Sequence, residues 1–182
     1  MFDHLNKSHQ LNRLALADIE HTMWCRSGGR IRVKWVKIRV CRRWFIATTH
    51  HAFNDVVVNC ADPRRPSGWI DRSIINAYNN LHLTGWAHSF EIWDADELVG
   101  GLYGVRINHF FAGESMFHHA TDASKVALVH LVDWLNNTGG QLLDVQWTTA
   151  HLVSLGAIDI SRTDYLELLK DAVSPNSRKN DD

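Results

Sequence analysis

The sequence has few cysteines, few prolines and no long hydrophobic run. Its three cysteines, Cys25, Cys41 and Cys60, are odd in number and lack CxxC spacing, so they predict reduced thiols and no disulfide framework. No apolar stretch approaches the roughly 20 residues of a membrane-spanning helix. Residues 1–10 are polar and lack the apolar core of a signal peptide. These absences predict a cytoplasmic protein without a membrane anchor.

Metal-binding patterns are also missing, although the chain holds 12 histidines. Two adjacent pairs, His50-His51 and His118-His119, would point to opposite sides of a strand. The helical zinc motif HExxH is absent, and the cysteines are too scattered to complete a four-ligand site. The sequence therefore predicts neither a structural nor a catalytic metal.

Acidic residues are absent from one long stretch. The formal net charge of −1 gives no global field that would attract nucleic acid. However, no Asp or Glu occurs between His21 and Asn54, and this stretch holds eight of the 19 basic residues. Such an asymmetry favours a polyanionic partner, and a solvated strand face explains it equally well. The eight residues are Arg26, Arg30, Arg32, Lys34, Lys37, Arg39, Arg42 and Arg43.

Hydrophobic residues make up 45% of the 182-residue chain, which is enough for the core of one domain. Helical spacing predicts helices over residues 11–24, 53–60, 69–83, 122–135, 151–155 and 163–172. Alternation and turn residues predict strands over residues 44–48, 87–93, 98–107, 110–117, 141–147 and 157–160. Residues 30–40 fit either a bulged strand or a short basic helix, and residues 62–68 fit a loop.

This order of elements predicts an α/β (α+β) fold, in which a mixed sheet with flanking helices contains a central antiparallel hairpin and a strand–helix–strand crossover. The layout is similar to that of the acetyltransferase-like (GNAT) superfamily. Its glycine-rich turn, which grips the pyrophosphate of coenzyme A, would lie where this chain has His118-His119-Ala120-Thr121-Asp122-Ala123. A pyrophosphate cradle needs glycines and an open helix N-terminus, so we expect no coenzyme A.

Three polar residues stand within apolar strands. Asp144 and Gln146 share one face if residues 141–147 form a regular strand. Glu114 follows Gly113, which allows a ligand or a backbone to come close. These residues indicate a site built on a sheet, or, with even odds from the pattern alone, polar residues that face water.

Several ordered motifs between residues 44 and 169 resemble the leucyl/phenylalanyl-tRNA–protein transferase family. They are His88-Ser89-Phe90-Glu91-Ile92-Trp93, Glu97-Leu98-Val99-Gly100-Gly101-Leu102-Tyr103-Gly104-Val105, Gly113-Glu114-Ser115-Met116-Phe117, Ala123-Ser124-Lys125, Asp144-Val145-Gln146 and His151-Leu152-Val153-Ser154-Leu155-Gly156-Ala157. The resemblance implies transfer of leucine or phenylalanine (or methionine) from aminoacyl-tRNA to the N-terminal Arg or Lys of a protein. The product would be marked for degradation by the N-end rule. The resemblance also implies a GNAT-like domain without a cofactor, because aminoacyl-tRNA is a substrate.

The resemblance also implies a role for each site residue. Gln146 would orient the attacking amine or relay its proton, and Asp144 would polarise Gln146. Glu114 would lie beside the acceptor's basic side chain, and Trp69 would stack on the terminal adenine with Tyr78 nearby; the pattern alone would favour Trp69 as a core residue. The amino-acid pocket would be Leu102, Phe111, Met116, Leu128, Leu131, Leu135 and Leu143, each of which could equally be plain core. Contacts to the tRNA backbone would come from Arg30, Arg32, Lys34, Lys37, Arg39, Arg42 and Arg43.

The resemblance divides the chain into three parts. Residues 1–29 are expected to be a divergent lead-in, with the family's N-terminal domain largely absent, and residues 30–172 a GNAT-like aminoacyltransferase domain. Residues 173–182 are expected to be a disordered tail. A monomer is expected. The alternatives are a truncated relative that binds tRNA with little catalysis, and a coenzyme A-dependent acetyltransferase, which residues 118–123 disfavour.

Overall fold

A computed structural model describes residues 12–14, 45–64 and 68–175. Its centre is a six-stranded sheet in which the strands follow chain order, β1-β2-β3-β4-β5-β6. Neighbouring strands are antiparallel except β5 and β6, which are parallel. The strands are β1 Asn12–Leu14, β2 Phe45–Thr49, β3 Ala87–Asp94, β4 Glu97–Ile107, β5 Phe110–His118 and β6 Leu142–Asp144. The predicted mixed sheet with a central hairpin and one crossover is therefore confirmed.

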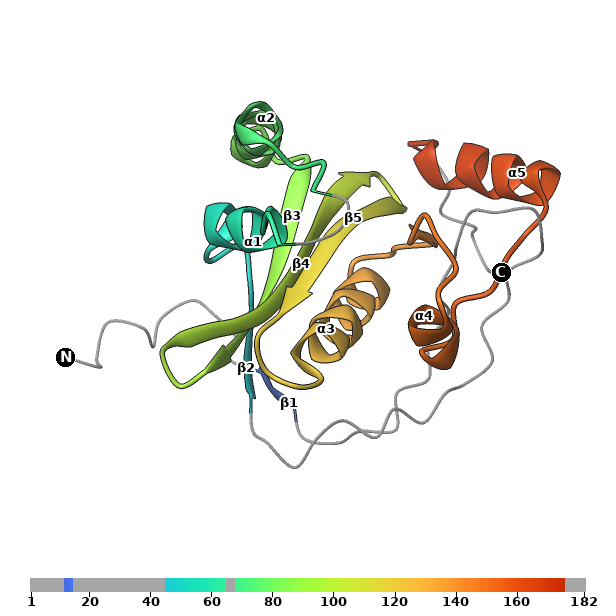
Figure 1. Cartoon of the computed structure of the whole chain (residues 1–182). Coiled ribbons are helices and arrows are strands. Elements are labelled where there is room, and N and C mark those ends of the chain that lie inside the picture. The colour runs from blue at the N-terminus through green and yellow to red at the C-terminus, as the bar shows by residue number, and fades with distance from the viewer. Residues whose placement is uncertain (1–11, 15–44, 65–67, 176–182) are drawn as a thin grey trace.

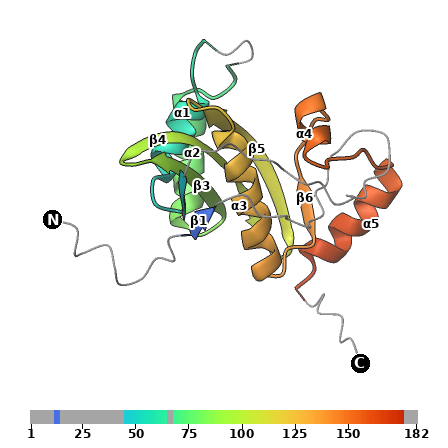
Figure 2. The ribbon, with the colours of Figure 1, turned by 90° about the horizontal axis from the view of Figure 1, so that it is seen from below.

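Helices cover both faces of this sheet (Figure 1). Helices α1 (Phe53–Cys60) and α2 (Arg72–Leu83) lie on one face, and α3 (Ala123–Asn137) packs on the other, where it connects β5 to β6. The short α4 (Ala150–Ser154) and α5 (Arg162–Val173) follow β6. Figure 2 shows β6 at the edge of the sheet, on the side of α5.

Alternation in β3 divides the core between the two faces. Phe90 and Ile92 point toward α3, whereas Ala87 points toward α1 and α2. The larger cluster, on the α3 side, includes Leu102, Phe111, Leu128, Leu131, Leu135, Leu142 and Leu143. The smaller cluster consists of Phe53, Val56, Val57, Cys60, Ile70, Ala87, Tyr103 and Phe117.

The register between β4 and β5 shifts at Tyr103/Gly104, in front of Glu114. Glycine is required there because a Cβ on Gly104 would overlap the carbonyl oxygen of Ala112. It would also overlap the Phe111 ring. This irregularity leaves Glu114 without a direct strand partner, since Gly113 and Ser115 take the paired positions.

Most predicted elements are confirmed with small changes of boundary, and some are corrected. The helix predicted from Trp69 begins at Arg72, because the Asp71 side chain caps it by accepting from the main-chain N–H of Ile74 at 2.9 Å. The strand predicted over residues 157–160 is reduced to bridges at 159 and 160. The N–H of its first residue, Ala157, is not available for strand pairing, because it donates to the carbonyl of Leu152 in α4.

The predicted helix over residues 11–24 is wrong at residues 12–14, which form β1. Pairing of Asn12 with Ala47 and Leu14 with Phe45 extends the sheet, and such tertiary pairing outweighs weak helical periodicity. The remainder of that helix and residues 30–40 lie outside the described residues, as do most of the predicted lead-in and tail. No helix among the described residues is long and apolar enough to cross a bilayer.

Candidate active site

Asp144 is the last residue of β6, and its side chain is only 5% exposed. Parallel pairing places it opposite Ala112, two residues before Glu114. Each carboxylate oxygen accepts a hydrogen bond: Oδ1 from the main-chain N–H of Gln146 at 2.8 Å, and Oδ2 from the Tyr165 hydroxyl at 2.8 Å. These donors supply what a buried carboxylate needs in place of water.

Gln146 lies beyond the strand, which corrects the prediction of a regular strand over residues 141–147. The strand ends at Asp144, and Gln146 adopts a left-handed conformation with φ of 65°. Its N–H thereby turns back to the Asp144 carboxylate. The two residues are in contact, but Asp144 bonds to the main chain of Gln146 rather than to its side-chain amide.

The amide of Gln146 reaches across to β5. Its Nε2 donates to the main-chain oxygen of Gly113 at 2.9 Å and to Oε2 of Glu114 at 3.2 Å. Both partners can only accept, so the orientation of the amide follows from chemistry. The amide oxygen, Oε1, is therefore the remaining acceptor of this side chain.

Glu114 connects this pair to α2. Tyr78 of α2 lies close enough to feel its charge: burial, followed by the negative charge of Glu114, raises the pKa of Tyr78. Tyr78 stays protonated at neutral pH and can act as a donor. Its ring also packs edge-on against the buried Tyr103, with ring centroids 5.0 Å apart. Hydrogen bonds thus form one network from α5 through the end of β6 to β5, and the charge of Glu114 lies near Tyr78 of α2.

Tyr165 is the member of this network that sequence reasoning missed. It lies on α5, is 6% exposed and donates to Asp144 from 21 residues farther along the chain. A signal was present, because a tyrosine buried on an apolar helix face needs a partner for its hydroxyl. Only the folded chain shows that the partner is Asp144.

Trp69 precedes α2 and is 48% exposed. Its neighbour Ile70 is buried against the smaller core cluster, which anchors this segment of chain. A tryptophan that filled the core would be buried, so the core alternative does not fit. The indole is free to present a face to a ligand, and that role stays a prediction.

The seven residues predicted to form the amino-acid pocket lie on the α3 face of the sheet and in α3. Six are buried and Met116 is partly buried against the same cluster. The structure brings them together, and core packing alone also accounts for them. The six are Leu102, Phe111, Leu128, Leu131, Leu135 and Leu143.

Two other sets of predictions concern charge and metals. The basic residues predicted to contact the tRNA backbone all lie outside the described residues: Arg30, Arg32, Lys34, Lys37, Arg39, Arg42 and Arg43. Within the described ranges, the His, Cys, Asp and Glu side chains form no group of three or more that could hold a metal ion. Cys60 is buried and forms no disulfide with another described residue.

Comparison with known families identifies the family of this chain. Residues 30–170 match the family model described as leucyl/phenylalanyl-tRNA protein transferase. The chain belongs to this family. The resemblance between residues 44 and 169 is thereby confirmed.

Individual relatives agree with this assignment. The leucyl/phenylalanyl-tRNA–protein transferase of Syntrophobacter fumaroxidans is 54% identical over 132 residues, which cover 71% of this chain and 56% of the relative. The protein of the same name from Hyphomonas neptunium is 49% identical over 142 residues, covering 77% of this chain and 55% of the relative. The chain therefore spans about half the length of the curated relatives that it matches.

Solved structures give weaker likenesses. A ribosomal-protein-alanine N-acetyltransferase from Brucella melitensis biovar Abortus aligns with a TM-score of 0.43 at 13% identity, covering 61% of this chain and 86% of that one. AAC(6')-Iy, in complex with a bisubstrate analogue of CoA, aligns with a TM-score of 0.45 at 11% identity, covering 68% and 88%. The family assignment depends on the sequence matches alone.

Proposed function

We propose that this chain transfers leucine or phenylalanine, or methionine, from an aminoacyl-tRNA to the N-terminal amino group of a protein. The observation that carries the proposal is the network around Gln146. Two donor bonds fix its amide nitrogen and Asp144 fixes its main chain, and the remaining amide oxygen is the atom that we assign to the substrate. The names of the relatives support the same reaction.

The reaction is aminolysis of an ester. The nitrogen of the acceptor amine forms a bond to the carbonyl carbon of the aminoacyl ester, and the bond from that carbon to the terminal adenosine oxygen breaks. Overall, the amine loses one proton and the leaving oxygen gains one. Proton transfer of this kind contributes roughly 10²–10⁴-fold when a side chain assists it, and alignment of the two substrates contributes at least as much.

We assign the orientation of the attacking amine to Gln146. Its Oε1 accepts a hydrogen bond from the attacking N–H, which points the nitrogen lone pair at the ester. An amide is too weak a base to keep the proton, so its part is to orient the amine and relay that proton. Asp144 acts through Gln146: it holds the left-handed turn from which the amide projects.

Glu114 is suited to the acceptor's basic side chain. Its carboxylate accepts from the Gln146 amide, and the Tyr78 side chain lies near it. A terminal Arg or Lys that pairs with Glu114 would place its α-amine near Oε1 of Gln146, because charge-assisted bonds fix both position and distance. Acceptors with such N-termini, and degradation of the product by the N-end rule, are part of this proposal.

The donor side uses exposed and basic residues. Trp69 offers an indole face on which an unpaired 3′ adenine can stack. The basic residues between Arg30 and Arg43 would neutralise tRNA phosphates and make binding strongly dependent on salt. The apolar residues predicted for the amino-acid pocket discriminate side chains by size, at about 1–3 kcal/mol per methylene. A cytoplasmic monomer that needs no cofactor completes the proposal.

A direct transfer assay tests this function. The chain is mixed with tRNA charged with radiolabelled leucine and with a protein that begins with Arg, and label in the protein is counted. The Asp144→Ala variant is compared with Asp96→Ala, whose exposed side chain lies in the turn between β3 and β4. Transfer by the wild type and the Asp96 variant, with little or none by the Asp144 variant, supports the proposal. A folded wild-type chain that binds leucyl-tRNA without transfer overturns catalysis and favours a tRNA-binding relative.

A further inference from the structure

Residues 144–149 form the turn that carries Gln146, and this Gln146 turn would not keep its shape unaided. The φ of Gln146 is 65°, in the left-handed region that a residue with a Cβ rarely adopts. Such a conformation persists only where the surrounding structure holds it. The bond from the Gln146 N–H to Asp144 holds the turn on the side of β6. The other side of the turn, toward α4, needs a contact of its own.

A hydrogen bond from Thr148 to Asp159 supplies that contact. The Thr148 hydroxyl donates to Oδ1 of Asp159, which lies 11 residues farther along the chain. A carboxylate only accepts, so the direction of the bond follows from chemistry. Both side chains are half-buried, which limits competition from water. The bond therefore joins the Gln146 turn to the segment that leads into α5.

Asp159 lies in a part of the chain that is itself held in place. Its neighbour Ile160 is 2% exposed and belongs to the larger core cluster. Ser161, the next residue, caps α5 by accepting from the N–H of Asp164 at 3.0 Å. Core packing and a helix end thus fix the main chain around Asp159, so its carboxylate offers Thr148 an acceptor in a fixed position.

Other hydrogen bonds of the Gln146 turn are local. The N–H of Trp147 donates to the carbonyl of Val145 at 2.7 Å, inside the turn. Thr149 caps α4, because its hydroxyl accepts from the N–H of Leu152 at 3.1 Å. These bonds shape the turn and start the next helix, whereas the Thr148 bond reaches a separate part of the chain.

The Gln146 turn is therefore held at both ends by the segment that follows α4. Tyr165 donates to Asp144 at its start, and Asp159 accepts from Thr148 near its end. A turn held at both ends keeps its left-handed residue without rearrangement. An active site benefits from such a turn, because a catalytic group that is already in place loses no time or energy to reorganisation.

We infer that Asp159 is a positioning residue of the proposed reaction. Through Thr148 it holds the Gln146 turn in the shape that brings the Gln146 amide to Glu114. The inference rests on the proposed function, which assigns the orientation of the attacking amine to Gln146. Because Asp159 acts through Thr148 and not on a substrate, its loss should lower kcat and leave KM nearly unchanged.

Hydrogen exchange of the Gln146 main-chain N–H tests the structural part without any substrate. Thr148→Val keeps the shape of the side chain and removes its hydroxyl, so the N–H that bonds to Asp144 should exchange about fivefold faster. Thr148→Ser keeps the hydroxyl and should keep slow exchange. Thr138→Val is the control, because it removes a hydrogen-bonded hydroxyl at the C-terminal end of α3. Exchange at the wild-type rate in Thr148→Val overturns the inference.

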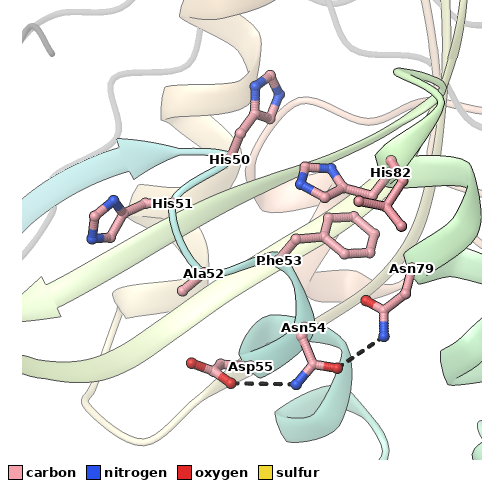
Figure 3. Close-up of a pocket in the computed structure, with 9 residues that line it drawn as sticks. His50, His51, Ala52, Phe53, Asn54, Asp55, Asn79 and His82 are labelled. Carbon is pink, nitrogen blue, oxygen red and sulfur yellow. Dashed lines mark hydrogen bonds between the residues drawn. The ribbon is translucent and has the colours of Figure 1, made fainter. Parts of the chain in front are cut away.

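Transfer kinetics test the catalytic part. Thr148→Val and Asp159→Ala should each lower kcat about fivefold at nearly constant KM. Both remove the same bond, so the double variant should be no slower than the slower single variant, and losses that multiply overturn the inference. Asn54→Ala removes the bond that Asn79 donates at 2.9 Å from α2 to α1 (Figure 3), and it should leave kcat unchanged.

The two measurements separate this inference from the proposed function. If the wild type transfers no amino acid, the proposed function fails and the inference fails with it. If the wild type transfers, and Thr148→Val exchanges faster at an unchanged kcat, only the inference fails. Melting curves of the same samples show that each variant is folded. Thr148→Val carries the test by itself if Asp159→Ala does not fold.

Discussion

Asp144 and Glu91 are two buried carboxylates of the same sheet, and they differ in where their hydrogen bonds lead. Glu91 has no exposed surface, and it accepts from the Ser89 hydroxyl at 2.5 Å, from the Thr48 hydroxyl at 2.7 Å and from the main-chain N–H of Ala52 at 3.4 Å. All of these donors belong to β2, β3 and the start of α1. The hydrogen bonds of Glu91 therefore join β2, β3 and the start of α1 inside the protein.

Asp144 is almost as buried, but one of its donors belongs to a turn. The N–H of Gln146 is held by Asp144, and the amide of the same residue extends to Glu114. In the proposed function, this chain of bonds ends at the amide oxygen that accepts from the substrate amine. Burial alone does not distinguish the two carboxylates, whereas the elements that supply their donors do.

Removal of Glu91 is the change with the largest expected effect on stability. Glu91→Ala leaves the buried hydroxyl of Ser89 and the half-buried hydroxyl of Thr48 without their acceptor, at a cost of roughly 2–4 kcal/mol. Urea denaturation should show this loss as a lower midpoint with an unchanged slope. Glu97→Ala, an exposed carboxylate in the same hairpin, is the control and should have little effect. A Glu91 variant as stable as the wild type would remove the contrast between the two carboxylates.

Asp144→Asn should have the opposite effect to Glu91→Ala: it should lower activity and leave stability nearly unchanged. Asparagine can still accept from Gln146 and can donate to the hydroxyl of Tyr165, so the fold is retained. The loss of charge and the looser turn should lower kcat/KM for transfer by roughly 10²-fold. Transfer kinetics and a melting curve measured on the same sample separate the two effects. If Asp144→Asn unfolds at ordinary temperature, Asp144 belongs with Glu91 as a structural residue.

Tyr165→Phe should have a smaller effect on both properties. It removes one hydrogen bond to Asp144 and keeps the ring in the core, so a stability loss of about 1 kcal/mol is expected. Transfer should fall by several-fold, through a lower kcat at nearly constant KM, because Tyr165 does not touch substrate. Leu166→Ala on the exposed side of α5 serves as the control. A change confined to KM would contradict a positioning role.

The sequence predicted the sheet well because alternation and turn residues are local signals. The hairpin of β3 and β4 and the crossover from β5 to β6 were both predicted from such patterns. β1 was missed, since three residues carry little pattern of their own and owe their conformation to pairing with β2. Pairing partners are set by tertiary structure, which a local window does not contain.

The sequence predicted which residues form the candidate site better than it predicted the hydrogen bonds between them. Resemblance to the family pointed to Asp144, Gln146 and Glu114, and the structure brings all three together. The left-handed φ of Gln146 was not predictable, because Gln has no preference for that region and only the bond to Asp144 accounts for it. Tyr165 was missed for a similar reason: its partner is 21 residues away in the chain.

A pair of histidines extends the comparison to groups that lose their charge through partial desolvation. His50 and His88 have pKa values of about 4 in the folded chain, against 6.5 for an unperturbed histidine. Between these values the unfolded chain binds more protons than the folded one, so stability is complete above about pH 6.5 and falls as the pH drops toward 4. Melting temperatures across this range should decrease. His88→Asn, which keeps a polar side chain but cannot titrate, should flatten the decrease in part, whereas exposed His151→Asn should change it less. Equal slopes for wild type and His88→Asn would show that the acid sensitivity comes from other groups.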